Sequence, residues 1–289
     1  MSEFSDAWLA LRKSADGAAR DDGLVRRLRL SAGDHCEVLD LGCGTGANLR
    51  YLAPLLGALG GGEQHWTCAD HDELLLSLLP ERTAVWAGRA GYGFRAEGHG
   101  FLVQHPRWSC RVRALRTDLA AALDRLPLPP GGLVTASALL DLVSADWLDA
   151  LLDRCRRARC RLLFALTYDG RWQCQPAHAE DATVMALVNR HQRSDKGFGP
   201  ALGPEAAAYA ELRCLALGYQ TQIVDSPWRI GPAQVPLQIA LIDGWHRAAL
   251  ELAPELRHRI DAWRDARRRY AVQGESRLIV GHRDLVANP

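Results

Sequence analysis

Lysine is almost absent from this 289-residue chain. Lys13 and Lys196 are its only lysines among 35 basic residues, so arginine carries nearly all of the positive charge. Together with the abundance of alanine, leucine and glycine, this indicates the codon bias of a GC-rich genome and not a binding adaptation. The formal net charge of +1 gives no overall field that would attract nucleic acid or an acidic membrane.

No Cys-x-x-Cys pair occurs among the eight cysteines, which stand at positions 36, 43, 68, 110, 155, 160, 174 and 214. Several of them lie inside apolar runs, as small buried residues do. Their spacing argues against a zinc site. We therefore expect no bound metal and reduced thiols in a cytoplasmic protein.

Long apolar runs and targeting segments are also missing. No run approaches the length that a membrane-spanning helix needs. The first residues, Met-Ser-Glu-Phe-Ser-Asp, lack the basic and apolar regions of a secretory signal. We therefore expect a cytoplasmic protein that does not act on a membrane.

A glycine-rich stretch at residues 38–49 organises the rest of the chain. Residues 38–41 form an apolar run typical of a buried parallel strand, and this run carries one acid, Asp40. Three glycines follow at alternate positions: Gly42, Gly44 and Gly46. Residues 48–59 predict a helix packed on the sheet. A strand, a glycine turn and a helix form the geometry of a nucleotide-type ligand site, where glycines let the backbone approach the ligand closely.

The stretch fits two kinds of cofactor. Residues 40–46, Asp-Leu-Gly-Cys-Gly-Thr-Gly, resemble motif I of the class I S-adenosylmethionine-dependent methyltransferases, which is Asp/Glu-x-Gly-x-Gly-x-Gly. Read as Gly42-x-Gly44-x-x-Ala47, the same residues satisfy the dinucleotide fingerprint. In the methyltransferase family the acid lies near the amino group of the methionine part, whereas a carboxylate is unhelpful beside a pyrophosphate. Asp40 therefore favours the methyltransferase interpretation.

Asp70 ends a strand predicted at residues 65–69. It follows Gly46 by 24 residues, where both cofactor families place an acid on the ribose hydroxyls. Asp72 is a nearby competitor, or else the cap of a helix over residues 74–79. Asp70 therefore predicts a ligand that carries a ribose without deciding which one.

Asp118 follows a strand predicted at residues 110–115. In the methyltransferase family, an acid at this place accepts a hydrogen bond from the adenine amino group. The backbone amide of the next residue, here Leu119, then donates to the adenine ring. The alternative is that Asp118 caps a helix at residues 120–126.

The resemblance places the methyl acceptor beside the loop after a fourth strand at residues 133–137. Ser137 begins this loop and is expected to contact the donor. Asp141 is an acid among apolar neighbours, and so is a candidate acceptor-binding or general-base group, with a capping or surface role as the alternative. Tyr168, at the end of the fifth strand, and His191 are further catalytic candidates from position alone.

The loop sequence also bears on the acceptor. Methyltransferases of base amino groups and glutamine carry Asn/Asp-Pro-Pro-Tyr/Phe after this strand, whereas Ser-Ala-Leu-Leu stands here. No basic stripe or appended nucleic-acid module occurs. A small-molecule acceptor is therefore favoured over nucleic acid, with a protein side chain as another option.

One α/β domain is expected over residues 1–289. We divide it into an N-terminal helical cap at 1–33, a cofactor-binding core at 34–170, an acceptor lid inserted at 171–204 and a C-terminal part at 205–289. Helices at 234–252 and 254–271 are expected in the last part. Arg12 and Arg20 of the cap either meet the methionine carboxylate or form a solvated helix face.

The resemblance implies a Rossmann-like sheet of seven strands in the order 3-2-1-4-5-7-6, with the last strand antiparallel and helices on both faces. The seven strands are predicted at 38–41, 65–69, 110–115, 133–137, 161–167, 219–224 and 277–280. A β-hairpin at residues 92–104 is inserted between strands 2 and 3, either as a decoration or as a contact in a homodimer.

The resemblance implies S-adenosylmethionine as cofactor and in-line methyl transfer to a small molecule. Such a transfer mainly requires alignment of acceptor and methyl group, and a general base only where the acceptor carries a proton. An NAD(P)-dependent Rossmann oxidoreductase and a non-catalytic methyltransferase-like binding protein are the alternatives. The first gives Asp118 no role and predicts no antiparallel final hairpin, and the second leaves the intact glycine motif unexplained.

Overall fold

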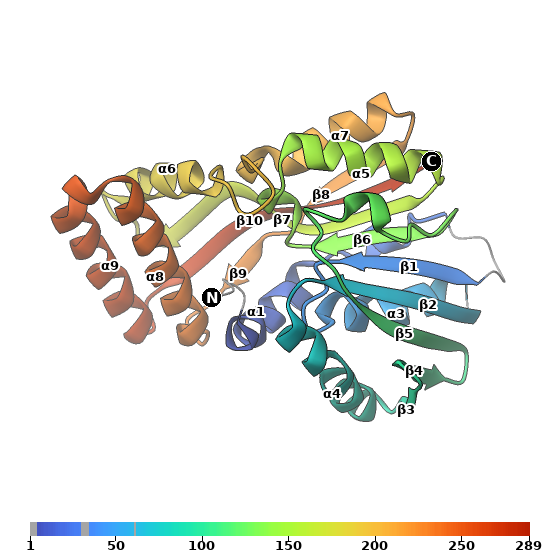
Figure 1. Cartoon of the computed structure of the whole chain (residues 1–289). Coiled ribbons are helices and arrows are strands. Elements are labelled where there is room, and N and C mark those ends of the chain that lie inside the picture. Colours follow the sequence, from blue (N-terminus) through green and yellow to red (C-terminus); the bar gives the residue numbers. More distant parts are fainter. Residues whose placement is uncertain (1–4, 30–34, 61) are drawn as a thin grey trace.

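The computed structural model describes residues 5–29, 35–60 and 62–289. The outer parts of the predicted cap, at residues 1–4 and 30–33, lie outside the described residues. In the described residues one continuous sheet forms the centre of the molecule (Figure 1). None of the described helices is both long and apolar enough to cross a membrane.

The sheet contains strands from both halves of the chain. Their bounds are β1 Cys36–Leu41, β2 Gly62–Asp70, β3 Gly93–Glu97, β4 Gly100–His105, β5 Trp108–Arg116, β6 Leu133–Ser137, β7 Arg161–Gln175, β8 Gln220–Asp225, β9 Trp228–Ile230 and β10 Arg277–Asn288. Within the described chain the order across the sheet is β3-β4-β5-β2-β1-β6-β7-β10-β8, and β9 pairs with β10.

The predicted order of seven strands is confirmed, because it corresponds to β5-β2-β1-β6-β7-β10-β8. β10 runs antiparallel to both of its neighbours, β7 and β8, as predicted for the last strand. The hairpin predicted at residues 92–104 is also present, as β3 and β4. It extends the sheet, since β4 pairs antiparallel with β5. Its role in a homodimer stays a prediction.

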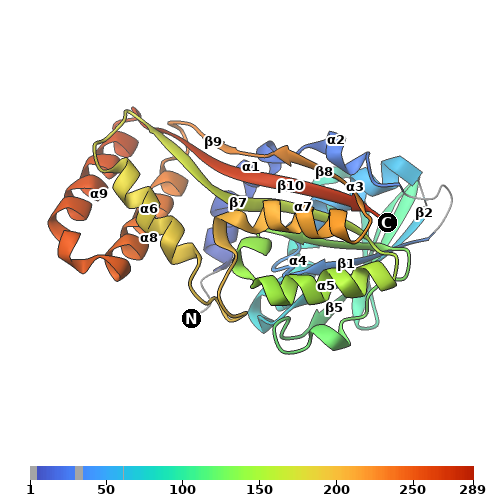
Figure 2. The ribbon, with the colours of Figure 1, turned by 90° about the horizontal axis from the view of Figure 1, so that it is seen from above.

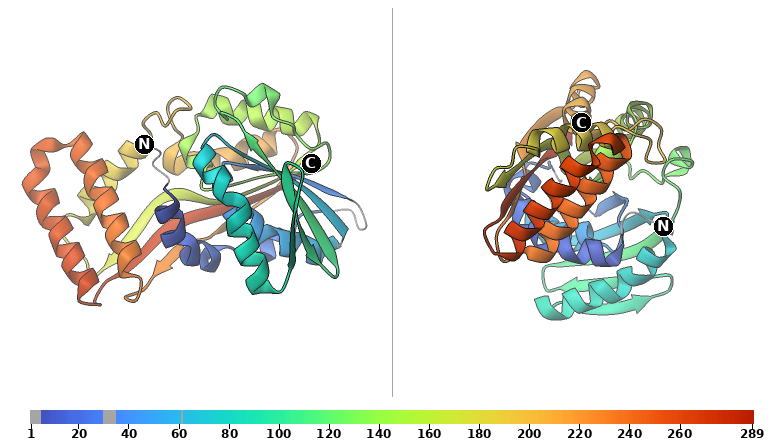
Figure 3. Two further views of the ribbon diagram at one scale, coloured as in Figure 1. Left: turned by 60° about the horizontal axis from the view of Figure 1, so that its bottom comes forward. Right: turned by 90° about the vertical axis from the view of Figure 1, so that its left-hand side faces the viewer.

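Helices cover both faces of the sheet. Their bounds are α1 Asp6–Ala19, α2 Asp22–Val25, α3 Ala47–Gly60, α4 Glu73–Ala90, α5 Ala145–Arg157, α6 Asp181–Gln192, α7 Ala206–Ala216, α8 Val235–Leu252 and α9 Arg257–Val272, with short 3₁₀ turns η1 Leu123–Arg125, η2 Leu140–Leu142, η3 Gly203–Glu205 and η4 Pro254–Leu256. Helices α5 and α7 lie on one face, and α1 to α4 on the other (Figure 2). The pair α8 and α9 lies side by side at the end of the molecule away from the β3–β4 hairpin (Figure 3).

Alternation along β1 explains the two layers of the core. Leu39 and Leu41 point into the cluster beneath α5 and α7, whereas Val38 points into the cluster beneath α2, α3 and α4. All three side chains are buried. A strand that buries both faces reads as a continuous apolar run, which is why residues 38–41 could be recognised in the sequence.

The end predicted for the fifth strand is wrong. β7 continues from residue 167 to Gln175, because β10 pairs with it from Ala287 opposite Leu162 to Arg277 opposite Gln175. In the added part, Trp172 is buried and its ring stacks on Trp245 of α8 at 4.5 Å between centroids. Residues 171–175 therefore belong to the sheet and not to the predicted lid, and β10 itself is much longer than predicted.

Two helix predictions also need correction. The helix predicted over residues 74–79 continues through Pro80 to Ala90 as α4. The alternative helix at 120–126 is only the 3₁₀ turn η1. There, the amides of Ala120 and Ala121 both donate to Oδ1 of Asp118, so the side chain supports a tight turn.

Candidate functional site

A cavity of about 300 Å³ opens where the carboxyl ends of β1, β2, β5 and β6 meet. Six of the eight predicted cofactor residues line it: Gly42, Gly44, Asp70, Asp118, Leu119 and Ser137. In open α/β sheets, ligands bind outside the carboxyl ends of the strands. The volume is within the range of small-molecule sites.

The glycine turn requires glycine at each of its three positions. Gly42, Gly44 and Gly46 have φ angles of 65°, 51° and 84°, which side chains rarely allow. A Cβ atom at Gly46 would lie 2.2 Å from Cδ1 of Leu79, and one at Gly44 would lie 3.3 Å from Cδ1 of Leu9. The turn is therefore pressed between α4 and α1, and Gly46 faces α4 and not the cavity.

Asp70 links two strand ends at the cavity. Its Oδ2 accepts a hydrogen bond from the amide of Gly44 at 2.7 Å, and its Oδ1 accepts one from the amide of Asp72 at 3.0 Å. Asp72 also caps α4, because its side chain accepts from the amide of Leu75 at 3.1 Å. The capping role weighed for Asp72 is thus present, and Asp70 is the acid that holds the turn.

Asp40 lies behind the glycine turn and does not line the cavity. It is fully buried, and its Oδ1 accepts a hydrogen bond from Nδ2 of Asn48 at 2.7 Å. Its Oδ2 has no partner among the described residues. Burial raises the pKa of Asp40 to about 7, although Asn48 and the charge of Arg20 act in the opposite direction.

Asp118 and Leu119 form another part of the cavity wall. Asp118 is exposed and uses Oδ1 for the turn described above, so it caps no α-helix there, and it lies on the cavity wall. Leu119 is buried, and its carbonyl accepts a hydrogen bond from Nε1 of Trp147 at 2.8 Å. This bond ties the wall to α5.

No protein-family model and no curated protein matches the chain, whereas several solved structures are similar to it. The cyclopropane synthase MmaA2 from Mycobacterium tuberculosis is 12% identical, with coverage of 99% of this chain and 95% of that chain and a TM-score of 0.49. A methyltransferase from Thiobacillus denitrificans, solved with S-adenosylhomocysteine, is 16% identical, with coverage of 99% and 92% and a TM-score of 0.39.

A methyltransferase from Aquifex aeolicus is 15% identical, with coverage of 77% and 93% and a TM-score of 0.42. Likenesses of this size say nothing about the reaction of this chain. Its own strand order, with the reversed β10, is that of the class I methyltransferase fold.

Helix α1 packs against the glycine turn through Leu9, and a second cavity of about 270 Å³ adjoins the first. Both cavities are lined by Leu9, Arg12, Gly42, Gly44 and Ser137. The second is also lined by four cations from three helices: Lys13, Arg50, Arg82 and Arg89. Of these, Arg82 pairs with Asp6. Burial and the three neighbouring arginines lower the pKa of Lys13, so this cavity favours an anionic group.

Arg12 and Arg20, the two cations predicted for a carboxylate, differ in position. Arg12 lines both cavities, but it is paired with Asp16 at 2.8 Å and lies 5.0 Å from the ring centroid of Trp228. The guanidinium of Arg20 lies 3.9 Å from the ring centroid of Tyr51 and lines neither cavity.

Asp141 is a buried acid in η2 that lines neither cavity itself, although its neighbours Leu139 and Leu142 line the first one. Its Oδ1 has no hydrogen-bond partner among the described residues. Burial raises the pKa of Asp141 to about 6, opposed by backbone hydrogen bonds from Asp141 itself and Tyr168 and by the charge of Arg12. A carboxyl group with this pKa can accept a proton near neutral pH.

Tyr168 and His191 lie differently from each other. Tyr168 neighbours Asp141, and its hydroxyl donates to Oδ1 of Asn189 at 2.8 Å. Burial and the nearby carboxylates raise the pKa of Tyr168, so it stays neutral. Neither Tyr168 nor His191 lines either cavity, and Nε2 of His191 lies 2.9 Å from Oε2 of Glu251 in α8, away from Asp141. The structure therefore brings Asp141 and Tyr168 together and leaves His191 apart.

Two strained residues near the site were missed in the sequence. Ala138 and Leu166 both have a φ of 55°, which is uncommon for residues other than glycine. The amide of Ala138 donates to the carbonyl of Ala165, and the amide of Leu166 donates to Oδ1 of buried Asp284. Such strain clusters at functional sites. Neither residue type signals it, so no sequence pattern could have found it.

Proposed function

We propose that this chain is an S-adenosylmethionine-dependent methyltransferase that acts on a small-molecule acceptor. One observation carries the proposal: residues that the motif resemblance assigned to separate parts of one donor molecule line a single cavity. The glycine turn, Asp70 and the pair Asp118–Leu119 come from three different strand ends. These strands, β1, β2 and β5, are neighbours in the sheet, and Asp40, which the resemblance assigned to the methionine part, lies behind the turn.

The residues present suit that donor. Gly42 and Gly44 leave the backbone open to the ligand, and Asp70 offers a buried carboxylate to the ribose. Asp118 and the amide of Leu119 would meet the adenine edge. Lys13 and its arginine neighbours line the second cavity, where their positive charge would attract the carboxylate of the donor. When bound, S-adenosylmethionine would supply a methyl group on a positively charged sulfur, which needs no acid to leave.

The chain's own residues would then align the acceptor and remove its proton. Asp141 is the proposed general base, since it is buried, lacks a partner at Oδ1 and has a pKa near neutrality. Tyr168 would position it through its backbone amide, and His191 is not assigned a part. Lys196, Gly197 and Phe198 of the predicted lid line the cavity, which supports closure of that segment over the acceptor.

The dinucleotide alternative is less well supported. It has no role for Asp118, yet Asp118 lies on the same cavity as Asp70. It also does not predict β10 inserted antiparallel between β7 and β8. A non-catalytic binding protein has no use for the unpartnered Oδ1 of Asp141 beside the cavity wall.

A transfer assay tests the proposal. The chain is incubated with methyl-labelled donor and panels of small amines, alcohols, phenols and thiols, with duplex DNA, RNA and a peptide mixture in parallel. We expect label in one small-molecule panel, and much less with Asp141→Asn. Label only in nucleic acid or peptide would refute the acceptor class. A chain that binds S-adenosylhomocysteine but labels nothing would be a binding protein.

A further inference from the structure

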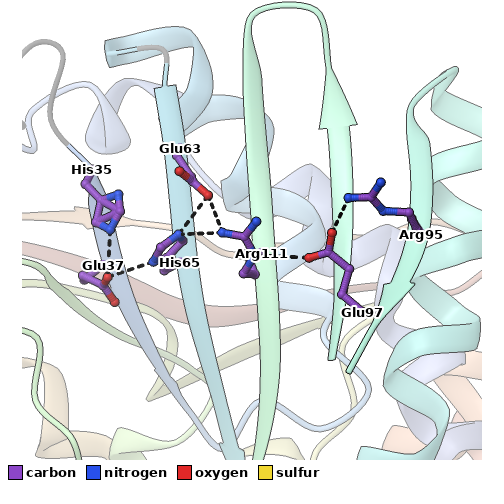
Figure 4. Close-up of polar contacts among 7 residues, drawn as sticks. All are labelled: His35, Glu37, Glu63, His65, Arg95, Glu97 and Arg111. Carbon is purple, nitrogen blue, oxygen red and sulfur yellow. Dashed lines mark hydrogen bonds and ion pairs between the residues drawn. The ribbon is translucent and has the colours of Figure 1, made fainter. Parts of the chain in front are cut away.

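The opposite edge of the sheet holds a second group of chemically active side chains. His35 and Glu37 stand at the amino end of β1, and Glu63 and His65 stand at the amino end of β2 (Figure 4). β1 and β2 are parallel neighbours, with Glu37 directly opposite His65. This edge lies at the other end of the strands from the donor cavity and takes no part in the proposed function.

Sequence spacing puts these side chains on one face. His35 and Glu37 are two residues apart in the sequence, and so are Glu63 and His65. Residues two apart along a strand point to the same side of it. The intervening Gln64 points the other way and is buried. Ligand atoms of His35, Glu63 and His65 all lie within 4.8 Å of one another. Two ligands of one zinc ion at about 2.1 Å are at most about 4.2 Å apart, so small side-chain rotations would suffice.

Glu37 orients both imidazole rings. Its Oε1 lies 3.1 Å from Nε2 of His35 and 3.0 Å from Nδ1 of His65. A carboxylate can only accept, so both of these ring nitrogens carry hydrogen, and in the neutral rings the other nitrogens have free lone pairs. A carboxylate that fixes the tautomer of a ligating histidine is a common arrangement around metal ions.

A proton or a cation belongs between Glu63 and His65. Nε2 of His65 lies 3.0 Å from Oε1 of Glu63, so with a neutral His65 that is protonated at Nδ1 two lone pairs would face each other. Arg111 of β5 now meets this demand, because its Nη1 is 2.5 Å from Oε1 of Glu63 and 3.3 Å from Nε2 of His65. The Nε atom of Arg111 also donates to Oε2 of Glu97 at 3.2 Å, so the guanidinium has a second partner (Figure 4).

Charge and exposure favour the replacement of Arg111 by an ion. The three glutamates of the cluster outnumber its two arginines, Arg95 and Arg111, which leaves one negative charge when both histidines are neutral. The side chains of His35, His65 and Glu63 are 45%, 30% and 42% exposed. Water can therefore reach the cluster and complete the coordination of an ion.

We propose that His35, Glu63 and His65 bind a divalent transition-metal ion, with zinc as the best match to two imidazoles and one carboxylate. Glu37 holds both rings, and Arg111 moves aside onto Glu97. The ion joins the amino ends of β1 and β2 and stabilises the folded chain by mass action. The cysteine spacing gave no sign of this site because it contains no cysteine.

Calorimetric titration of the full chain with zinc chloride, after removal of bound metal by a chelator, tests the proposal. We expect saturable binding of one ion, reduced at least tenfold by His65→Ala and by Glu63→Gln. His258→Ala changes an exposed histidine in α9, away from the cluster, and should bind zinc as the wild type does. Cys36→Ser excludes a contribution from the one cysteine that is not buried. Arg111→Gln removes the competing guanidinium and should tighten binding.

Binding that survives both His65→Ala and Glu63→Gln would overturn the proposal, as would a wild type that takes up no zinc at millimolar concentration. Weaker zinc binding by Arg111→Gln than by the wild type would contradict the proposal that the Arg111 guanidinium occupies the place of the ion. Circular dichroism checks that each variant is folded. Titration with S-adenosylhomocysteine should give the same result for all of them, because the donor cavity lies at the opposite edge of the sheet.

Discussion

Oδ2 of Asp70 lies 2.7 Å from the backbone nitrogen of Gly44, so the acid that ends β2 holds the turn that follows β1. Its other oxygen accepts from the amide of Asp72. Each carboxylate oxygen has two lone pairs, so both oxygens keep capacity for the hydroxyls of a ribose. One side chain thus shapes the cavity and presents acceptors to it.

Asp70→Asn should weaken binding of S-adenosylhomocysteine by about tenfold or more. The amide has the size of the carboxylate but loses the charge and one acceptor, and hydrogen bonds to charged groups contribute about 1.5–3 kcal/mol. Isothermal titration calorimetry measures the change. Asp149→Asn is the matched control, since Asp149 bonds Tyr209 and Arg213 away from both cavities. Equal losses of affinity for S-adenosylhomocysteine in the two variants would mean that Asp70 makes no direct contact with the ligand.

Gly46→Ala should abolish donor binding and lower the melting temperature. The added Cβ would lie 2.2 Å from Cδ1 of the fully buried Leu79 at a φ of 84°, so the turn or the packing of Leu79 must shift. Gly98→Ala is the control, because Gly98 also has a positive φ of 50° but lies in open space in the hairpin turn. Its cost should be about 1 kcal/mol of stability, with donor binding unchanged. Normal donor binding by Gly46→Ala would contradict the proposed role of the turn.

Asp141→Asn should lower kcat at least a hundredfold and leave the affinity for S-adenosylhomocysteine unchanged, because a general base contributes about 10²–10⁴-fold. With an acceptor that carries a proton, the wild-type rate should rise with pH through about 6, where Asp141 loses its proton. Tyr168→Phe, which loses only the bond to Asn189, should keep that limb of the profile. The same pH limb in Asp141→Asn would mean that another group is the base.

Asp141 also makes stability depend on pH. Its pKa in the folded chain, about 6, is above the ordinary 3.8, so its contribution is favourable below pH 3.8 and is lost as the pH rises through 6. Two pKa units correspond to about 3 kcal/mol, of which about 1 kcal/mol falls between pH 5 and pH 8. Asp141→Asn should therefore gain stability relative to the wild type over that interval. Urea unfolding of both proteins at pH 5 and pH 8 measures the difference in their free energies of unfolding. A difference that is the same at both pH values would contradict the raised pKa of Asp141.

The sequence predicted the parts of the fold that depend on local pattern. Leu39 and Leu41 belong to a continuous apolar run, and the three glycines of the turn stand at fixed spacing from Asp40 and Asp70. Strand order followed from the resemblance that these residues support. Asp118 could be placed because it directly follows a strand.

The rest depends on partners far away in the chain. β7 could not be predicted beyond residue 167, since burial of Trp172 requires the stack on Trp245 in α8. The left-handed Leu166 follows from its bond to Asp284 in β10. The pairing of Glu37 with His65 needs the register of two strands, and spacing within one segment does not supply it.

Parallel titrations of the full chain with S-adenosylmethionine, S-adenosylhomocysteine and NAD test the central claim most directly. We predict saturable binding of both sulfur compounds at a single site, loss of that binding in Gly46→Ala, and no heat from NAD. Tight binding of NAD without binding of S-adenosylhomocysteine would contradict the account and assign the cavity to a dinucleotide.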